Sequence, residues 1–105
     1  MGVSSTGSSH FVYKLIPPRP SFPQDASDAE TAIMERHFSY WRGLFDQGHV
    51  IVYGPVADPS GTWGLAIIEA GTEQEIRAIG AADPAVRSKA FSFEVYSMPN
   101  VLVRP

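Results

Sequence analysis

The sequence predicts an α+β fold of the ferredoxin-like type, a βαββαβ sandwich in which two helices cover one face of a four-stranded antiparallel sheet. Strand-like and helix-like segments follow one another in that order along the 105 residues. Both helix-like segments begin with a capping-box pattern, and the chain is long enough for one hydrophobic core but too short for two. We therefore expect a flexible leader rich in Gly, Ser and Thr over residues 1–9, and a single domain over residues 10–105.

Four segments rich in β-branched and aromatic residues are expected to form the strands, over residues 10–16, 50–56, 63–70 and 91–98. The prolines that follow the first strand end it, because proline lacks an N–H and restricts the residue before it. We expect Gly54-Pro55 to interrupt the second strand. The turn-forming segment 58–61 then joins the second and third strands as a hairpin.

Two helices are expected between these strands. The first runs from Asp28 to Gln47, because Ser27–Glu30 has the capping-box pattern and Gly48 is a left-handed stop. The second helix is shorter: Thr72 and Glu75 form the same capping pattern, and the helix extends to about residue 81. Asp83-Pro84 then breaks it.

His37 lies at the centre of the apolar stripe of the first predicted helix. At 100° per residue, five apolar or aromatic side chains project within about 60° of it: Ile33, Met34, Tyr40, Trp41 and Leu44. A buried imidazole without a hydrogen-bond partner costs about 1–3 kcal/mol. We therefore expect His37 either to have a buried partner or to line a cavity.

The sheet face that the helices leave open is expected to be largely apolar too. In the last strand, alternation places Phe91, Phe93 and Val95 opposite Ser92, Glu94 and Tyr96. In the second strand, alternation places Ile51 and Tyr53 on one face and Val50 and Val52 on the other. In the third strand, it places Ala66 and Ile68 on one face and Leu65 and Ile67 on the other. Two short helices cover only one face, so a second layer should cover the other. The simplest such layer is a second copy of the chain in a two-fold homodimer.

The composition excludes several classes of function. The net charge of −3 comes from 11 acidic and 8 basic residues with no run of either sign, so no nucleic-acid partner is expected. The absence of cysteine excludes disulfides and thiolate chemistry. The three histidines fall on separate elements and no glycine-rich phosphate turn is present, so we expect no metal and no cofactor. Without a signal-peptide pattern or a membrane-length apolar run, we expect a cytoplasmic protein with no membrane partner.

His37, the helix end at Gln47-Gly48, Gly54-Pro55 and Ala82-Asp83-Pro84 occur in an order and spacing that resemble the YciI-like (YCII-related) family of small proteins. The resemblance covers roughly residues 13–98. It implies a ferredoxin-like domain that dimerises as an α+β barrel, with an active site centred on a helix histidine and the aspartate of the Asp-Pro pair, here His37 and Asp83. One branch of the family is associated with dehydrochlorination in the breakdown of chlorinated aromatics, which implies lyase or isomerase chemistry.

Three departures from the family pattern leave the substrate open, and one of them is an unusually proline-rich stretch over residues 17–26. Ala85 follows Asp83-Pro84 where the family usually has an aromatic residue. Residues 86–90 lack the usual glycine before the last strand. None of these departures changes His37 or Asp83.

A carboxylate bound to one ring nitrogen of His37 fixes the tautomer and leaves the other nitrogen as a general base or acid. The alternative is a core histidine bound to a carbonyl or a water, with Asp83 only shaping the turn before the proline. Candidate substrate-binding residues have structural alternatives as well. Gly54 and Pro55 either form the floor of a pocket or are only an irregularity in the strand. Arg19 either binds a carboxylate or phenolate of the substrate or is a solvated surface residue. Glu94, with Tyr96, binds a polar ligand or lies at the dimer interface.

The favoured function is a small dimeric enzyme that uses a His–Asp acid/base pair on an aromatic or enolisable small molecule. Proton transfer would be coupled to elimination or isomerisation. The alternative is a non-catalytic dimeric module that binds a small ligand or a partner protein, and a third possibility is a structural subunit without chemistry. The fold alone does not separate these functions.

Overall fold

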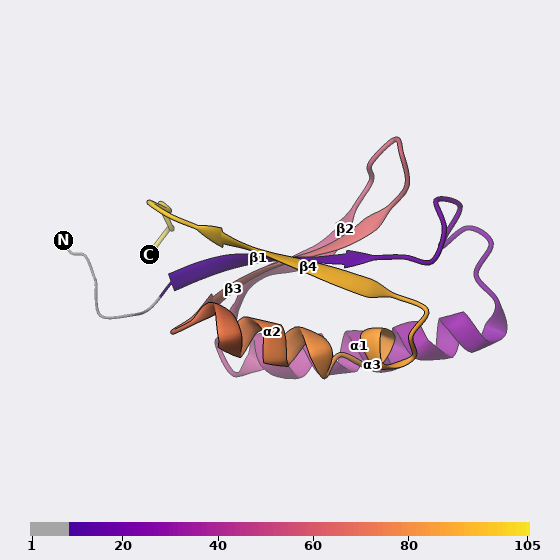
Figure 1. Cartoon of the computed structure of the whole chain (residues 1–105), viewed down its shortest axis with the longest axis horizontal. Helices are drawn as coiled ribbons and strands as arrows, with labels where there is room; N and C mark the ends of the chain where they lie inside the picture. The colour runs from indigo at the N-terminus through magenta and orange to yellow at the C-terminus, as the bar shows by residue number, and fades with distance from the viewer. Residues whose placement is uncertain (1–8) are drawn as a thin grey trace.

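The computed structural model describes residues 9–105, in which the helices lie on one face of a four-stranded antiparallel sheet (Figure 1). The strands are β1 (Ser9–Ile16), β2 (Val50–Val56), β3 (Trp63–Ala70) and β4 (Ser92–Met98), in the order β2-β3-β1-β4. The central pair, β3 and β1, is antiparallel, and so is each outer pair. The predicted ferredoxin-like order of strands and helices is therefore confirmed. The predicted leader falls outside the described residues except for Ser9, which begins β1.

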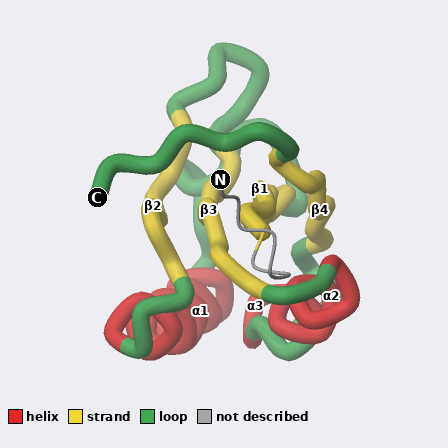
Figure 2. The backbone as a smooth tube through the Cα atoms, turned by 90° about the vertical axis from the view of Figure 1, so that its left-hand side faces the viewer, coloured by secondary structure: helices red, strands yellow, loops and turns green. Residues whose placement is uncertain are grey.

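The two main helices, α1 (Asp28–Asp46) and α2 (Glu73–Ala81), begin at the predicted capping boxes. In α1 the Ser27 hydroxyl accepts from the Glu30 N–H at 3.1 Å, and the Glu30 carboxylate accepts from the Ser27 N–H at 2.9 Å. Gly48 follows α1 with φ +88°, the left-handed conformation expected of a helix stop. In Figure 2, α1 lies beneath the β2 side of the sheet and α2 beneath the β4 side. No helix within residues 9–105 is long and apolar enough to cross a membrane.

A third helix, α3 (Pro84–Arg87), was not predicted, because four residues are too few to produce a helical period. Asp83 is its N-cap and Pro84 its first residue, a position where proline loses no hydrogen bond. The turn into β4 has no glycine, and Lys89 takes the left-handed conformation there with φ +70°. The chain thus makes the turn at the cost of some backbone strain.

The predicted interruption of β2 at Gly54-Pro55 is wrong. The strand continues through this pair, and Pro55 lies opposite Gly64 of β3. Proline is tolerated there because β2 is an edge strand, so a missing N–H need not break the ladder. The irregularity lies at the start of the strand, where the register shifts between Val50 and Val52.

This bulge also changes which residues of β2 share a face. Val50 lies opposite Ile68 and Tyr53 opposite Ala66, so both face the helices. The predicted grouping of Ile51 with Tyr53, and of Val50 with Val52, is therefore wrong. A regular strand has a period of two, and one extra residue reverses every side chain beyond it.

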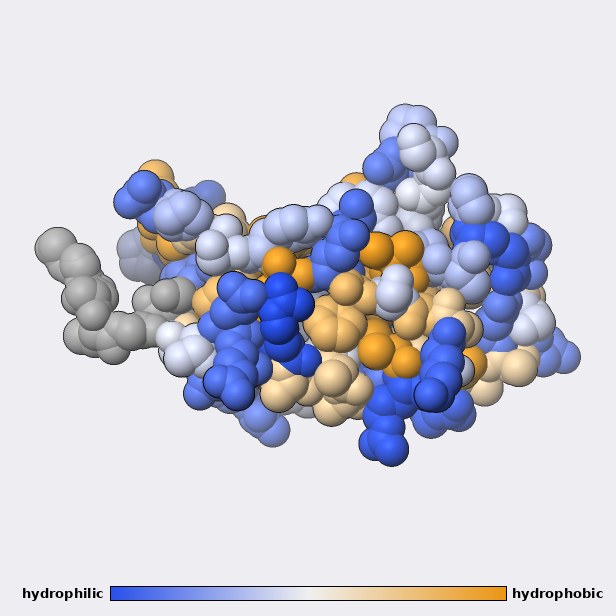
Figure 3. All heavy atoms as spheres, viewed as in Figure 1, coloured by the Kyte–Doolittle hydropathy of each residue, from blue (hydrophilic) through white to orange (hydrophobic). Residues whose placement is uncertain are grey.

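The core fills the space between the sheet and the helices. It is built from Phe11, Tyr13, Leu15, Phe22, Trp41, Val50, Ala66, Ile68, Ile76, Ala85, Phe91 and Val95. On the side that carries β4 and α2, apolar side chains gather between sheet and helices, with hydrophilic ones around them (Figure 3). The opposite sheet face carries Val12, Leu65 and Ile67, and Val52 and Tyr96 are about half exposed, at 50% and 52%.

Adding a single methyl group at Gly80 should strongly affect the stability of the fold. A Cβ at this position in α2 would lie 2.7 Å from the ring of Phe93 and 2.8 Å from that of Tyr13. We expect Gly80→Ala to lower the free energy of unfolding by about 1–3 kcal/mol through overpacking. Gly43→Ala is the matched control, because a Cβ there meets nothing within 4 Å and alanine favours the α1 helix by about 0.5–1 kcal/mol. Urea unfolding followed by tryptophan fluorescence should give opposite signs for the two variants, and equal signs would contradict the packing.

Candidate active site

A buried carboxylate organises the site. Asp83 is 0% exposed and accepts hydrogen bonds from three side chains and one backbone N–H. Its Oδ2 accepts from the Tyr13 hydroxyl at 2.9 Å and from Trp41 Nε1 at 2.7 Å, and its Oδ1 accepts from the Ala85 N–H at 2.9 Å. Nδ1 of His37 lies 2.9 Å from each oxygen. The four donors come from β1, α1 and α3, so the carboxylate joins the sheet to the helices.

The local sequence explains why these groups meet. His37 and Trp41 are four residues apart on α1 and therefore lie on one side of that helix. Tyr13 is on the helix-facing side of β1, and its ring packs 4.6 Å from that of Trp41. Asp83 is placed beneath them by the end of α2 and the start of α3, whose first turn it caps.

The protonation states follow from these contacts. Burial favours the neutral acid, but the hydrogen bond and charge of His37, with the bonds from Trp41 and Ala85, hold the pKa of Asp83 below its usual range. Asp83 is thus a carboxylate that only accepts, so His37 donates through Nδ1. Burial, with the charge and hydrogen bond of Asp83, raises the pKa of Tyr13 far above its usual value, so its hydroxyl stays a donor. Nε2 is then the ring nitrogen of His37 that a ligand can use.

His37 borders a cavity of about 190 Å³. The remaining lining is apolar, aromatic or uncharged: Leu15, Pro17, Phe22, Pro23, Met34, Tyr53, Gly54, Pro55, Thr62, Trp63, Gly64 and Phe91. No Asp, Glu, Lys or Arg lies among these described lining residues. The cavity therefore suits a neutral, largely apolar ligand that presents one polar group to His37.

Tyr53 forms part of the wall beside the histidine. The centroid of its ring lies 5.8 Å from that of the His37 ring. The Tyr53 ring is also stacked on the Trp41 ring, with 6.0 Å between the two centroids. Burial and the charge of Asp83 raise the pKa of Tyr53 to about 12, so the phenol is protonated at neutral pH. It adds an aromatic surface and a neutral hydroxyl to the cavity, but no charge.

The structure brings together four of the six residues expected at the site. His37, Gly54 and Pro55 line the cavity, and Asp83 lies behind His37. Arg19 lies outside the lining, and its guanidinium is bound by Asp25 and Glu30. Glu94 lies on the open sheet face, where its carboxylate accepts from the Tyr96 hydroxyl at 2.6 Å.

Sequence reasoning missed Tyr13 and Trp41 as partners of Asp83, and Tyr53 as a wall of the cavity. Trp41 has the right spacing from His37, four residues along one helix, to have been considered. Tyr13 carries no such signal, because it meets Asp83 across 70 residues of sequence. Among residues 9–105, no group of three His, Cys, Asp or Glu side chains could hold a metal ion.

Comparison with known proteins gives one family. The family model described as the YCII-related domain matches residues 14–99, most of the chain. A search of curated proteins returned no match. The matched range includes all of the residues that surround Asp83 except Tyr13, one residue before its start.

Asp83→Asn should destabilise the protein because an amide presents N–H groups to the donors that now bind the carboxylate. We expect a loss of about 2–4 kcal/mol in the free energy of unfolding at pH 7, measured by urea denaturation. Since the folded-state pKa of Asp83 is lowered, its contribution is complete above its ordinary pKa of 3.8 and is lost as the pH falls through the folded-state value. The difference between wild type and variant should therefore shrink below about pH 4. Asp46→Asn is the control, because Asp46 makes an exposed i,i+4 pair with Arg42, and this variant should leave the midpoint of urea denaturation unchanged. A similar loss of stability in both variants would contradict the hydrogen-bond network around Asp83.

Proposed function

Because the chain belongs to the YCII-related family, we propose that it is a small-molecule enzyme in which His37 transfers a proton to or from a neutral ring-sized substrate. The observation that carries this proposal is the 2.9 Å contact from His37 Nδ1 to the buried Asp83 carboxylate, beside a cavity. This contact fixes the tautomer and orients Nε2, while Asp83 stabilises the imidazolium that forms when Nε2 takes a proton. Asp83 is fully buried and does not line the cavity, so it acts through His37.

The cavity supports an aromatic or enolisable substrate. An apolar cavity of 150 Å³ holds benzene, so about 190 Å³ accommodates one ring with small substituents. A carbonyl or hydroxyl on that ring would meet Nε2 of His37, and the uncharged walls strengthen this one polar contact. Proton transfer at such a substrate is the step that an elimination or an isomerisation requires.

The test is exchange of the α-protons of cyclohexanone in deuterium oxide, followed by NMR. Wild type should accelerate this exchange, and His37→Asn should lower the rate by about 10²-fold or more, the usual contribution of a general base. The asparagine amide still donates to Asp83, so the fold should be kept. His49→Asn, at an exposed histidine before β2, is the matched control and should exchange like wild type.

Two outcomes separate the functions. Exchange in wild type no faster than in buffer contradicts proton-transfer chemistry on this ligand class. Binding of cyclohexanone that survives both His37→Asn and Asp83→Asn, without exchange, supports the alternative of a non-catalytic binding module.

We also propose that two copies pair through the open sheet face. Val12, Leu65 and Ile67 lie there side by side on β1 and β3, with Val52 and Tyr96 about half exposed beside them. An apolar sheet face of this kind is typical of an interface. In a two-fold pair, the same surface would serve on both copies.

Ile67→Lys tests this pairing, because it places a charge near the middle of the open face. We expect the dimer dissociation constant, measured by analytical ultracentrifugation, to rise about 100-fold or more, since an unpaired charge would be buried. Gln74→Lys adds the same charge on the exposed side of α2 and should leave the constant within twofold. A wild type that is monomeric at micromolar concentration would refute the proposal.

A further inference from the structure

The segment between β1 and α1, residues 17–26, forms one wall of the cavity, and we call it the proline-rich segment. Pro17, Phe22 and Pro23 of this segment all line the cavity beside His37. Phe22 is only 6% exposed, and its ring meets that of Phe91 edge-on at 5.2 Å. The position of this segment therefore decides the shape of the space in front of the histidine.

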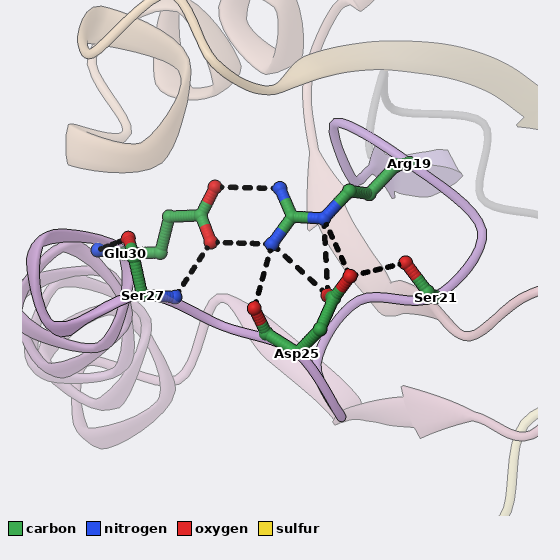
Figure 4. Close-up of polar contacts among 5 residues, drawn as sticks. All are labelled: Arg19, Ser21, Asp25, Ser27 and Glu30. Atoms are coloured by element: carbon green, nitrogen blue, oxygen red, sulfur yellow. Dashed lines mark hydrogen bonds and ion pairs between the residues drawn. The ribbon is translucent and has the colours of Figure 1, made fainter.

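Arg19 binds two acidic residues, Asp25 within the proline-rich segment and Glu30 on α1 (Figure 4). Within the segment, its Nε donates to both carboxylate oxygens of Asp25 at 3.0 Å, and Nη2 donates to the Asp25 backbone carbonyl at 3.0 Å. Towards the helix, Nη1 and Nη2 donate to the two oxygens of Glu30 at 2.8 and 2.7 Å. This paired geometry is specific to a guanidinium, because a lysine ammonium cannot bind both carboxylates in the same planar arrangement.

Glu30 lies on the side of α1 that faces the cavity. Met34 and His37 follow it at four and seven residues, so the three share one stripe of the helix. Met34 and His37 both line the cavity. Arg19 therefore fastens the proline-rich segment to the same stripe that carries the proposed base.

We propose that Arg19 is a positioning residue that sets the size selectivity of the cavity by holding Phe22 and Pro23 in its wall. The inference rests on the proposed function, since it concerns the ligand of the same site. With the segment held, the cavity admits one ring and excludes two fused rings. When the contact to Glu30 is lost, the wall moves away and the cavity accepts both.

The contact persists across the working pH range. The hydrogen bond from Arg19, with that from the Ser27 N–H, lowers the pKa of Glu30 to about 2. The carboxylate is therefore ionised at any pH above about 4, and acidification to pH 5 should not release the segment.

The first test compares phenol, with one ring, and 2-naphthol, with two fused rings, in NMR titrations of wild type and variants. Arg19→Gln should weaken phenol binding about fivefold and lower the ratio of phenol to naphthol affinity about tenfold or more. Arg77→Gln is the matched control, because Arg77 makes an exposed i,i+4 pair with Glu73 on α2. It should change neither quantity by more than twofold.

A second pair of variants separates the ion pair from the helix cap. Glu30→Gln keeps a capping-box residue but removes the charge that binds Arg19. Glu75→Gln makes the same change at the same capping position of α2, where the carboxylate accepts from the N–H groups of Gly71 and Thr72 and pairs with no arginine or lysine among residues 9–105. We expect Glu30→Gln to shift the selectivity ratio in the same direction as Arg19→Gln, and Glu75→Gln to leave it unchanged.

The last test needs no ligand. The chain has no cysteine, so Met34→Cys introduces a single thiol in the cavity behind the proline-rich segment. Iodoacetamide should label this thiol about tenfold faster when Arg19→Gln is added, and at an unchanged rate when Arg77→Gln is added.

The proposal is overturned if Arg19→Gln leaves either the labelling rate or the selectivity ratio as in wild type, or if phenol does not bind to wild type. Failure of the proposed function is seen separately. In that case the labelling and selectivity change with Arg19, but exchange of cyclohexanone does not depend on His37.

Discussion

The fold depends on one buried carboxylate, that of Asp83. A charge removed from water in this way costs several kcal/mol unless donors replace the lost hydration. Here the donors belong to different elements: Tyr13 on β1, His37 and Trp41 on α1, and the backbone of Ala85 on α3. The distance between the sheet and α1 is therefore fixed by hydrogen bonds as well as by apolar packing. Gly80 contributes to the same arrangement, because its missing side chain leaves room for the ring of Tyr13.

The same burial gives Asp83 and His37 different positions relative to the cavity. Asp83 is fully buried and does not line the cavity, but its contact with Nδ1 fixes the tautomer of His37. His37 lies at the boundary between this polar cluster and an apolar cavity. An imidazole held by a carboxylate thus borders a space with no charged side chain among its described lining residues, as the proposed proton transfer requires.

The sequence predicted the elements well because their signals are local. Both capping boxes, the left-handed Gly48 and the bounds of β2 and β3 follow from neighbouring residues alone. The bulge at Ile51 has no such signal, because it is defined by pairing with β3. The place of Arg19 was equally hidden, since a charged residue in a proline-rich segment looks like an ordinary surface residue until Glu30 is found beside it.

The candidate site was predictable in part for the same reason. His37 stood out because a polar residue in the middle of an apolar stripe needs an explanation, and the family resemblance supplied Asp83 as its partner. Tyr13 and Trp41 did not stand out, because aromatic residues at core positions need no special explanation. Their polar atoms become informative only when the long-range packing brings them to the carboxylate.

The bulge in β2 has a consequence for how the chain can change in length. Val50 and Tyr53 both face the helices although two residues separate them. In a regular strand, only one residue separates consecutive side chains on the same face. Loss of the one extra residue between Val50 and Val52 would restore a regular strand in which Val50 and Tyr53 still share the helix-facing side and keep their partners on β3. We therefore expect the start of β2 to accept a strand shorter by this one residue without moving either the core residue or the cavity residue to the other face.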